Sequence, residues 1–277
     1  MPRIAVLGGS GWLGSRLLAE LGDAPGVEVI SPPRIAVEGA TPAGLRSLLS
    51  PDESLAVVNC VGVIRGTDEQ IDSANLDFVR VLMQSLEGSG AYLVQVGSAA
   101  EYGDPGSADP IPETRPTHPV TVYGRSKALA TALVHDRSDW CVVRPFNGID
   151  RDMTPINPLG EIREKVRAAR ESGGEVELWS AATVRDHVSR DFLARSLAWA
   201  ARERPAGVFN LCSGVGLSYR EIAEAMAEIS GGRLPIRDLA RESGIPAVVG
   251  DPSAWRGSSG LSEAMDAEQV AALVMSG

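Results

Sequence analysis

The stretch that decides the fold lies near the start of the chain and reads Arg3-Ile4-Ala5-Val6-Leu7-Gly8-Gly9-Ser10-Gly11-Trp12-Leu13-Gly14. A short apolar run leads into a glycine cluster, and an amphipathic segment, Ser15–Leu21, follows it. Glycines there permit a tight turn and let backbone N–H groups approach a pyrophosphate, which the positive end of the next helix also favours. The spacing satisfies both G-x-x-G-x-x-G and G-x-G-x-x-G. The stretch therefore predicts the phosphate-binding turn of a dinucleotide-binding fold.

Short apolar runs alternate with helix-like segments beyond this turn, which is typical of a parallel sheet covered on both faces. The predicted strands are Arg3–Leu7, Val27–Ser31, Leu55–Cys60, Ala91–Val96, Trp140–Arg144 and Val208–Leu211. The predicted helices are Ser15–Leu21, Ile71–Leu86, Tyr123–His135, Gly160–Ser172, Asp186–Ala201, Tyr219–Ile229 and a terminal one near Ser262–Met275. We expect an α/β, doubly wound Rossmann fold.

The 277 residues suffice for one such sheet and an appended lobe. We expect residues 1–149 and 186–213 to form the dinucleotide-binding domain. We expect residues 150–185 and 214–277 to form a small, discontinuous substrate lobe.

Composition excludes several classes of protein. A hydrophobic content of 44% with 22% charged residues is ordinary for a soluble globular chain. The formal net charge of -10 disfavours a nucleic-acid partner, which would need a basic face. No apolar run reaches the roughly 20 residues that cross a bilayer, and we find no signal-peptide pattern. We expect a cytoplasmic protein without membrane contact. Its three cysteines predict buried thiols in a reducing compartment and no metal site.

The end of the second predicted strand bears on cofactor choice. An NAD site usually places Asp or Glu there to bind the ribose 2′-hydroxyl, whereas this chain has Ser31, Pro32, Pro33 and Arg34. An arginine could pair with a 2′-phosphate, which a carboxylate would repel. The sequence therefore favours NADP(H), with NAD(H) as the alternative.

Tyr123 and Lys127 are four residues apart at the start of a predicted helix, so both side chains lie on one face. The chain has only two lysines, which makes a chance Tyr-x-x-x-Lys pairing rare. A cation about 5 Å from the phenol would lower its pKa by roughly two units, toward the range useful for proton transfer. Ser98 follows a predicted strand at the carboxyl end of the sheet, where its hydroxyl could hydrogen-bond the reacting oxygen. We expect these three residues to be catalytic.

Several motifs together resemble the extended short-chain dehydrogenase/reductase family of NAD-dependent epimerases, dehydratases and nucleotide-sugar ketoreductases. They run in order over about residues 4–225. They are Gly8–Gly14, Asn59–Gly62, Ser98–Gly103, Tyr123–Lys127, Arg144–Asn147, Arg185–Val188 and Gly207–Gly214.

The resemblance implies roles for individual residues. The cofactor would contact the glycine turn, the second strand end, the Asn59–Gly62 segment and the catalytic helix. These residues are Gly8, Ser10, Gly11, Trp12, Leu13, Gly14, Ser31, Arg34, Asn59, Cys60, Val61, Gly62, Tyr123 and Lys127. The substrate would contact Ser98, Ala99, Asn147 and Arg185, the last two near its diphosphate. Asn75 would support the active-site helix, and family members dimerise through helices that correspond to Ile71–Leu86 and Tyr123–His135, so we expect a homodimer.

In the dehydratases of the family that this chain resembles, an Asp-Glu pair directly follows the catalytic hydroxyl. This chain has Ala99 and Ala100 at those two positions. The expected function is therefore NADPH-dependent reduction of a nucleotide-linked 4-keto-deoxysugar, with dTDP as the expected nucleotide, in natural-product sugar biosynthesis. Three alternatives stay open. They are a nucleotide-sugar epimerase with tightly bound NAD, a carbonyl reductase or dehydrogenase acting on a substrate without a nucleotide, and a non-enzymatic NADP-binding redox sensor.

Overall fold

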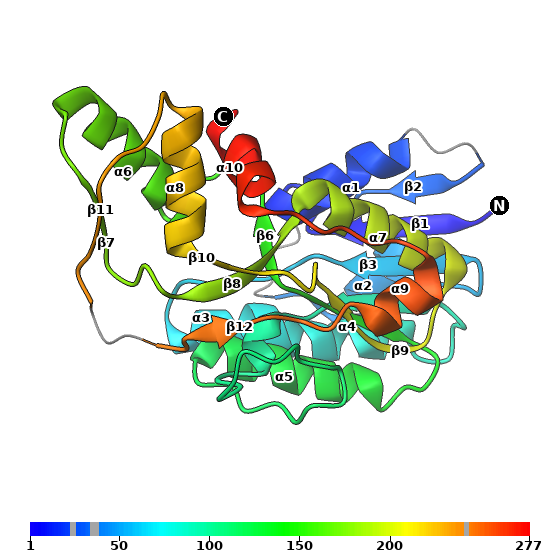
Figure 1. Ribbon diagram of the computed structural model, residues 1–277. Helices are drawn as coiled ribbons and strands as arrows, with labels where there is room; N and C mark the ends of the chain where they lie inside the picture. The colour runs from blue at the N-terminus through cyan, green and yellow to red at the C-terminus, as the bar shows by residue number, and fades with distance from the viewer. Residues whose placement is uncertain (23–25, 34–38, 241–243) are drawn as a thin grey trace.

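A six-stranded parallel sheet forms the centre of the molecule in the computed structural model, which describes residues 1–22, 26–33, 39–240 and 244–277 (Figure 1). Its strands, in spatial order, are β2 (Glu28–Ile30), β1 (Arg3–Leu7), β3 (Leu55–Asn59), β4 (Tyr92–Val96), β5 (Cys141–Pro145) and β9 (Gly207–Leu211). The apolar runs pair in parallel, and Ile4 to Leu7 are at most 1% exposed because helices cover both faces. The doubly wound fold expected from the sequence is confirmed.

The strand order reverses between β1 and β3, since the chain first moves outward from β1 to β2 and then returns to the other side. Helices α1 (Trp12–Gly22) and α7 (Arg190–Glu203) pack together on one face of the sheet (Figure 1). Helices α4 (Phe78–Leu86) and α5 (Val122–His135) lie on the other, with α2 (Pro42–Leu49) beside α4. A crevice at such a reversal is where open α/β sheets bind ligands.

The helix predicted over Ile71–Leu86 is interrupted. It consists of α3 (Asp68–Asp72), a π-helical turn η1 (Ser73–Asp77) and α4. The wider turn contains Asn75, whose side chain is buried. Such π-turns recur at functional sites because they reorient single side chains within a helix.

A second group of elements packs beyond the carboxyl ends of the central strands. One sheet joins β6 (Asn147–Ile149), β8 (Val184–Ser189), β10 (Gly216–Ser218) and β12 (Ala247–Val248), and a further pair joins β7 (Val176–Leu178) and β11 (Ile236–Asp238). The helices here are α6 (Pro158–Ser172), α8 (Tyr219–Ile229) and α10 (Ala267–Met275), which share a separate apolar core (Figure 1). Helix α9 (Ser253–Ser259) differs, because its Trp255 packs into the core of the central sheet, edge-on to Trp199 and Phe209.

Two predicted helix boundaries were wrong. The helix expected from Asp186 begins at Arg190, because residues 184–189 pair with β6 as strand β8. The terminal helix begins at Ala267 rather than near Ser262, with Asp266 and Gln269 forming a capping box. Glu263 instead accepts hydrogen bonds from the N–H and the hydroxyl of Ser189, so this segment supports the start of α7. Within the described ranges, no helix is both long enough and apolar enough to span a bilayer.

Candidate active site

The glycine turn joins β1 to α1 at the carboxyl end of the sheet. Gly8 has a φ of +77°, and the N–H of Gly11 donates to its carbonyl at 2.9 Å. A Cβ on Gly8 would lie 3.0 Å from the backbone of Cys60 and Val61, and one on Gly14 would overlap the Gly8 carbonyl oxygen. Glycine is therefore required at both positions by backbone packing.

A cavity of about 590 Å³ opens directly above this turn. Three segments line it, namely the turn itself, the end of β2 and the loop after β3. The lining residues are Leu7, Gly8, Gly9, Ser10, Gly11, Ser31, Pro32, Pro33, Cys60, Val61, Gly62 and Val63. The cavity thus brings together half of the predicted cofactor contacts, namely Gly8, Ser10, Gly11, Ser31, Cys60, Val61 and Gly62, at the point where the strand order reverses.

The residues present fit a dinucleotide. Among the residues that the structure describes, a Cβ at Gly11 would meet only the Gly8 carbonyl oxygen, at 3.2 Å, which leaves room for a phosphate to approach. Helix α1 begins at Trp12 and directs its unpaired N–H groups toward the same space. These donors and the positive helix end suit a pyrophosphate.

Six of the predicted cofactor residues that the structure describes do not line the cavity, namely Trp12, Leu13, Gly14, Asn59, Tyr123 and Lys127. Trp12, Leu13 and Gly14 form the first turn of α1, and the Trp12 ring lies over Gly148 with the Arg190 guanidinium 5.4 Å from its centre. Asn59 is fully buried; its amide donates to Gln95 at 2.8 Å, and its Oδ1 accepts the N–H of Val61 at 3.1 Å. Asn59 therefore shapes the cavity loop from beneath. Arg34 lies outside the described residues.

The three predicted catalytic residues come from two elements beside this cavity. Ser98 follows β4 and caps the short helix η2 (Ala99–Glu101), while Tyr123 and Lys127 occupy the first turns of α5. Lys127 Nζ donates to the carbonyl of Val96 at 2.9 Å and lies 6.0 Å from the centre of the Tyr123 ring. A Cβ on Gly62, which lines the cavity, would lie 3.1 Å from Lys127 Nζ. The ammonium thus reaches the cavity wall.

Asn75 supports the same wall from the π-turn. Its Oδ1 accepts the N–H of Val63 at 3.0 Å, and its amide donates to the Val63 carbonyl at 2.8 Å. These bonds fix the loop after β3, and a Cβ on Gly62 would also lie 3.1 Å from Asn75 Oδ1. Asn75 therefore holds the cavity loop, and the π-turn that carries it also contacts α5, the helix of Tyr123.

The predicted substrate residues lie on two adjacent strands of the second sheet and on η2. Asn147 on β6 donates to the carbonyl of Asp186 at 2.8 Å. Arg185 on β8 donates to the carbonyls of Val184 and Ile245, at 2.8 and 2.9 Å, and is partly exposed. Ala99 follows Ser98 directly. Asn147 and Arg185 are thereby held on neighbouring strands, while Ser98 and Ala99 come from the central sheet.

Comparison with known proteins agrees with this geometry. A profile of the NAD dependent epimerase/dehydratase family matches residues 4–212. The chain belongs to this family. It is therefore an NAD(P)-binding enzyme of the extended short-chain dehydrogenase/reductase type, as the sequence motifs predicted.

Individual relatives divide between two activities. The chain is 30% identical over 282 residues to dTDP-6-deoxy-L-talose 4-dehydrogenase (NAD(P)(+)) of Kitasatospora kifunensis, covering 92% of this chain and 86% of that protein. It is 29% identical over 197 residues to a UDP-glucose 4-epimerase of Streptococcus mutans, covering 63% of this chain and 59% of the epimerase. The structure of RMD from Pseudomonas aeruginosa, complexed with NADPH, superposes with a TM-score of 0.85 at 24% identity, covering 100% of this chain and 98% of that one.

The electrostatics of this short-chain dehydrogenase/reductase site correct one expectation. Lys127 was expected to bring the pKa of Tyr123 below its usual value, but burial raises the pKa of Tyr123, and a hydrogen bond to Ser98 offsets only part of the rise. The pKa of Lys127 falls to about 8, because burial disfavours its charge more than Glu101 and Cys60 favour it. Loss of water is the largest cause of the pKa shift in each of the two groups.

Sequence reasoning assigned no role to two buried acids that organise the site. Asp186 accepts four hydrogen bonds, from the N–H and hydroxyl of Ser213 and the N–H groups of Gly214 and Gly250. Glu101 joins the Ser98 loop to α5 and β5. Both residues stand inside recognised motifs, and an acid within such a motif is the signal that could have identified them.

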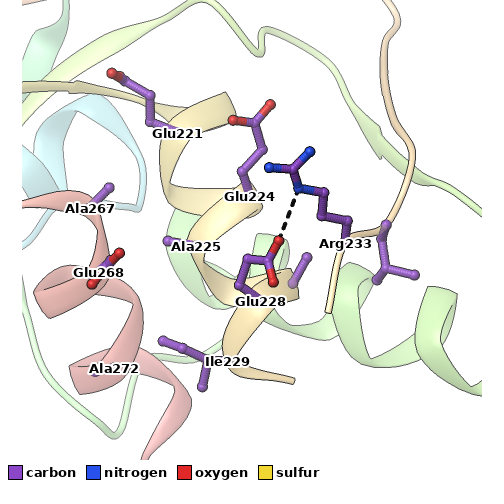
Figure 2. Close-up of a pocket in the computed structure, with 11 residues that line it drawn as sticks. Glu221, Glu224, Ala225, Glu228, Ile229, Arg233, Ala267, Glu268 and Ala272 are labelled. Carbon is purple, nitrogen blue, oxygen red and sulfur yellow. Dashed lines mark hydrogen bonds and ion pairs between the residues drawn. The ribbon is translucent and has the colours of Figure 1, made fainter. Parts of the chain in front are cut away.

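A second cavity, of about 900 Å³, lies away from this site, between α8 and α10. Figure 2 shows Glu221, Glu224 and Glu228 along one side of α8, with Arg233 bonded to Glu228. None of the predicted site residues lines it. The catalytic assignment therefore rests on the smaller cavity above the glycine turn.

Proposed function

We propose that this enzyme is an NADPH-dependent ketoreductase acting on the C4 carbonyl of a dTDP-linked deoxysugar, within natural-product sugar biosynthesis. The observation that carries the proposal is the similarity, over 92% of the chain, to a dTDP-6-deoxy-L-talose 4-dehydrogenase. Run in the reducing direction, a 4-dehydrogenase reaction is a 4-ketoreduction.

The acid-base groups beside Ser98 support a simple hydride transfer over a dehydration. Ala99 and Ala100 have no titratable side chain, and the next acid, Glu101, is 0% exposed and bonded to Arg144. Elimination of water from the sugar needs a second positioned acid and base, whereas reduction of a ketone needs one proton donor. The described site supplies that one donor.

Each residue of the site has a distinct role in the proposed reduction. NADPH, when bound, would supply the hydride. Tyr123 donates its proton to the substrate oxygen, and the raised pKa of its buried phenol keeps that proton in place at neutral pH. Ser98 hydrogen-bonds the same oxygen, and Lys127, held by the Val96 carbonyl, presents its charge at the cavity wall. Asn147 and Arg185 would bind the diphosphate.

The NADP preference rests on the second strand end. Ser31, Pro32 and Pro33 line the cavity, and no carboxylate appears among its described lining residues. A carboxylate would repel a 2′-phosphate, so its absence there favours NADPH. Titration of the protein with NADPH and NADH tests the preference. We expect Arg34→Ala to weaken NADPH about tenfold and leave NADH unchanged.

We also propose a cytoplasmic homodimer formed through α4 and α5. Leu129 on α5 is 52% exposed, which suits a contact between copies, and the three free cysteines suit a reducing compartment. Sedimentation at several concentrations tests the dimer.

The decisive assay combines the protein with NADPH and a panel of dTDP-linked and UDP-linked 4-keto-6-deoxysugars. We expect stoichiometric NADPH oxidation and a product heavier by two hydrogens, with dTDP substrates preferred. Substrates without a nucleotide should react at least about a hundredfold less efficiently, since the diphosphate contacts would be lost.

The epimerase of Streptococcus mutans supports a second candidate function. If the enzyme is an epimerase, NAD should co-purify with it, and a UDP-sugar should change configuration without net NADPH oxidation. A redox sensor would bind NADP and convert none of these substrates.

A further inference from the structure

Glu101 is a buried carboxylate that the proposed reaction does not use. Its Oε2 accepts a hydrogen bond from Arg144 Nε at 2.8 Å, and both side chains are shielded from solvent. Its Oε1 accepts the N–H of Ser98 at 2.8 Å and the hydroxyl of Thr131 at 3.0 Å. The loop that carries Ser98, the helix that carries Tyr123 and Lys127, and strand β5 therefore meet at one side chain.

The backbone makes room for this carboxylate. A Cβ on Gly97 would overlap Oε1 of Glu101 and approach Thr131 Oγ1 to 3.2 Å. Glycine at this position thus leaves space for the acid directly beside Ser98. The fit shows that Glu101 has a defined place in the fold.

Arg144 extends the network away from the site. Its Nη1 donates to the Tyr102 hydroxyl at 2.9 Å, and its guanidinium lies 4.7 Å from the centre of the same ring. The Tyr102 hydroxyl is also 2.7 Å from Asn210 Oδ1 on β9. A buried acid is retained at low cost only when paired and fully hydrogen-bonded, and Glu101 meets both conditions.

We infer that Glu101 is a positioning residue, whose carboxylate holds Ser98 at a fixed place beside the helix that carries Tyr123 and Lys127. This inference rests on the proposed catalytic use of those three residues. Ser98 Oγ must meet the substrate oxygen together with the Tyr123 hydroxyl, so a shift of a few tenths of an ångström in the loop lowers the rate.

The charge of Glu101 acts on the same pair. It raises the pKa of Lys127 against the lowering by burial, and it adds to the rise that burial causes in the pKa of Tyr123. Glu101 is faced by Arg144 and Thr131, and Arg144 in turn by Tyr102. Lys127 is also faced by Cys60, and Tyr123 by Ser98. Loss of the carboxylate charge therefore favours deprotonation of both the phenol and the ammonium.

Glu101→Gln tests the inference, because it keeps the shape and removes the charge. We expect kcat for ketosugar reduction to fall at least about tenfold, with KM and the NADPH Kd changed by less than about threefold. The high-pH limb of the kcat profile should move to lower pH, since reduction needs Tyr123 protonated. Glu101→Asp retains the charge with a shorter reach, so its kcat should fall while its pH profile stays near that of the native enzyme.

Glu113→Gln is the matched control. Glu113 accepts the N–H of Asn210 at 2.8 Å at the far end of the network, and we expect native kcat and a native pH profile. Native kcat and a native profile in Glu101→Gln would overturn the inference. If circular dichroism shows that Glu101→Gln does not fold, Thr131→Val tests the inference instead. It removes the hydrogen bond from Thr131 to Glu101 and no charge. Its kcat should fall about threefold at native KM, and an unchanged kcat would overturn the inference.

Tyr123→Phe separates this inference from the proposed function. An inactive Tyr123→Phe beside a fully active Glu101→Gln refutes only the role of Glu101. An active Tyr123→Phe refutes the catalytic assignment itself.

Discussion

The ammonium of Lys127 lies 6.0 Å from the centre of the Tyr123 ring and is bonded to the carbonyl of Val96. The two side chains share one face of α5 because they are one helical turn apart. Lys127 therefore has a fixed place at the cavity wall independent of the phenol. Because the Tyr123 phenol and the Lys127 ammonium have different surroundings, a separate prediction follows for each.

Replacement of Tyr123 by Phe should remove the proton donor and keep the packing. We expect kcat to fall by about 10³-fold, with the NADPH Kd changed by less than about twofold. Tyr92→Phe is the control, because that hydroxyl donates to the Pro205 carbonyl in the core of the sheet. It should lower the free energy of unfolding by about 1 kcal/mol and leave kcat unchanged. Residual activity above one-tenth of native in Tyr123→Phe would contradict the assignment.

Deprotonation of Lys127 should determine where kcat/KM falls at high pH. Burial lowers its pKa to about 8, so kcat/KM for reduction should fall as the pH rises above about 8 and the charge at the cavity wall is lost. Lys127→Met should abolish that fall and weaken NADPH about tenfold. The exposed ion pair of Lys165 with Glu161 makes Lys165→Met the control, with no change expected. If the fall in kcat/KM at high pH persists in Lys127→Met, another group than Lys127 causes it.

The same buried ammonium should cost stability. Its folded pKa lies below the unfolded value of 10.5, so the unfolded chain binds this proton more tightly. Stability should therefore rise between about pH 8 and pH 10.5, an effect of about 3 kcal/mol at most. Lys127→Met, which loses the bond to Val96 as well, should gain about 1–2 kcal/mol at pH 7. Urea unfolding of the native protein and of Lys127→Met at pH 7 measures this difference in the free energy of unfolding. A less stable Lys127→Met would show that the buried ammonium does not destabilise the fold.

A methyl group at Gly11 should obstruct the cofactor more than the fold. Of the described part of the chain, its Cβ would touch only the Gly8 carbonyl oxygen, at 3.2 Å, beside the cavity that Gly11 lines. We expect Gly11→Ala to raise the NADPH Kd at least about tenfold and to change the unfolding free energy by less than about 1 kcal/mol. Gly22→Ala, at the far end of α1, should leave both unchanged, since a Cβ there would have no heavy atom of the other described residues within 4 Å. Equal Kd values for the two variants would refute a phosphate site at this turn.

Asp186 should be a determinant of stability. An amide at this position can accept at only one atom. Because the two carboxylate oxygens serve different donors, the change leaves without a partner either the N–H of Ser213 or the N–H groups of Gly214 and Gly250. We expect Asp186→Asn to lose about 2–4 kcal/mol, or roughly 5–10 °C in Tm. Asp191→Asn breaks a solvent-exposed pair with Arg16 and should lose less than 1 kcal/mol. Calorimetry of the two variants makes the comparison, and equal losses would refute the role of the buried bonds.

Most strands of the central sheet could be predicted because buried parallel strands appear in a sequence as uninterrupted apolar runs between helical segments. Strand β8 could not, since its residues Arg185, Asp186 and His187 are polar and precede a strongly helical segment. Pairing with β6 and the bonds to Asp186 hold this segment extended, and both depend on residues distant in the chain. The π-turn around Asn75 was likewise invisible, because the helical pattern continues through it.

The sequence by itself determined the family and the glycine turn, and it predicted the catalytic roles of Ser98, Tyr123 and Lys127, because these depend on local spacing and on side-chain chemistry. Only the tertiary structure decided the protonation of the pair, since the pKa of a buried group depends on how much water its neighbours exclude. It also decided the distant partners of Glu101, which bonds Thr131 and Arg144, 30 and 43 positions away along the chain. Those two contacts form when the sheet assembles, whereas the bond to Ser98, three residues away, is a local capping box.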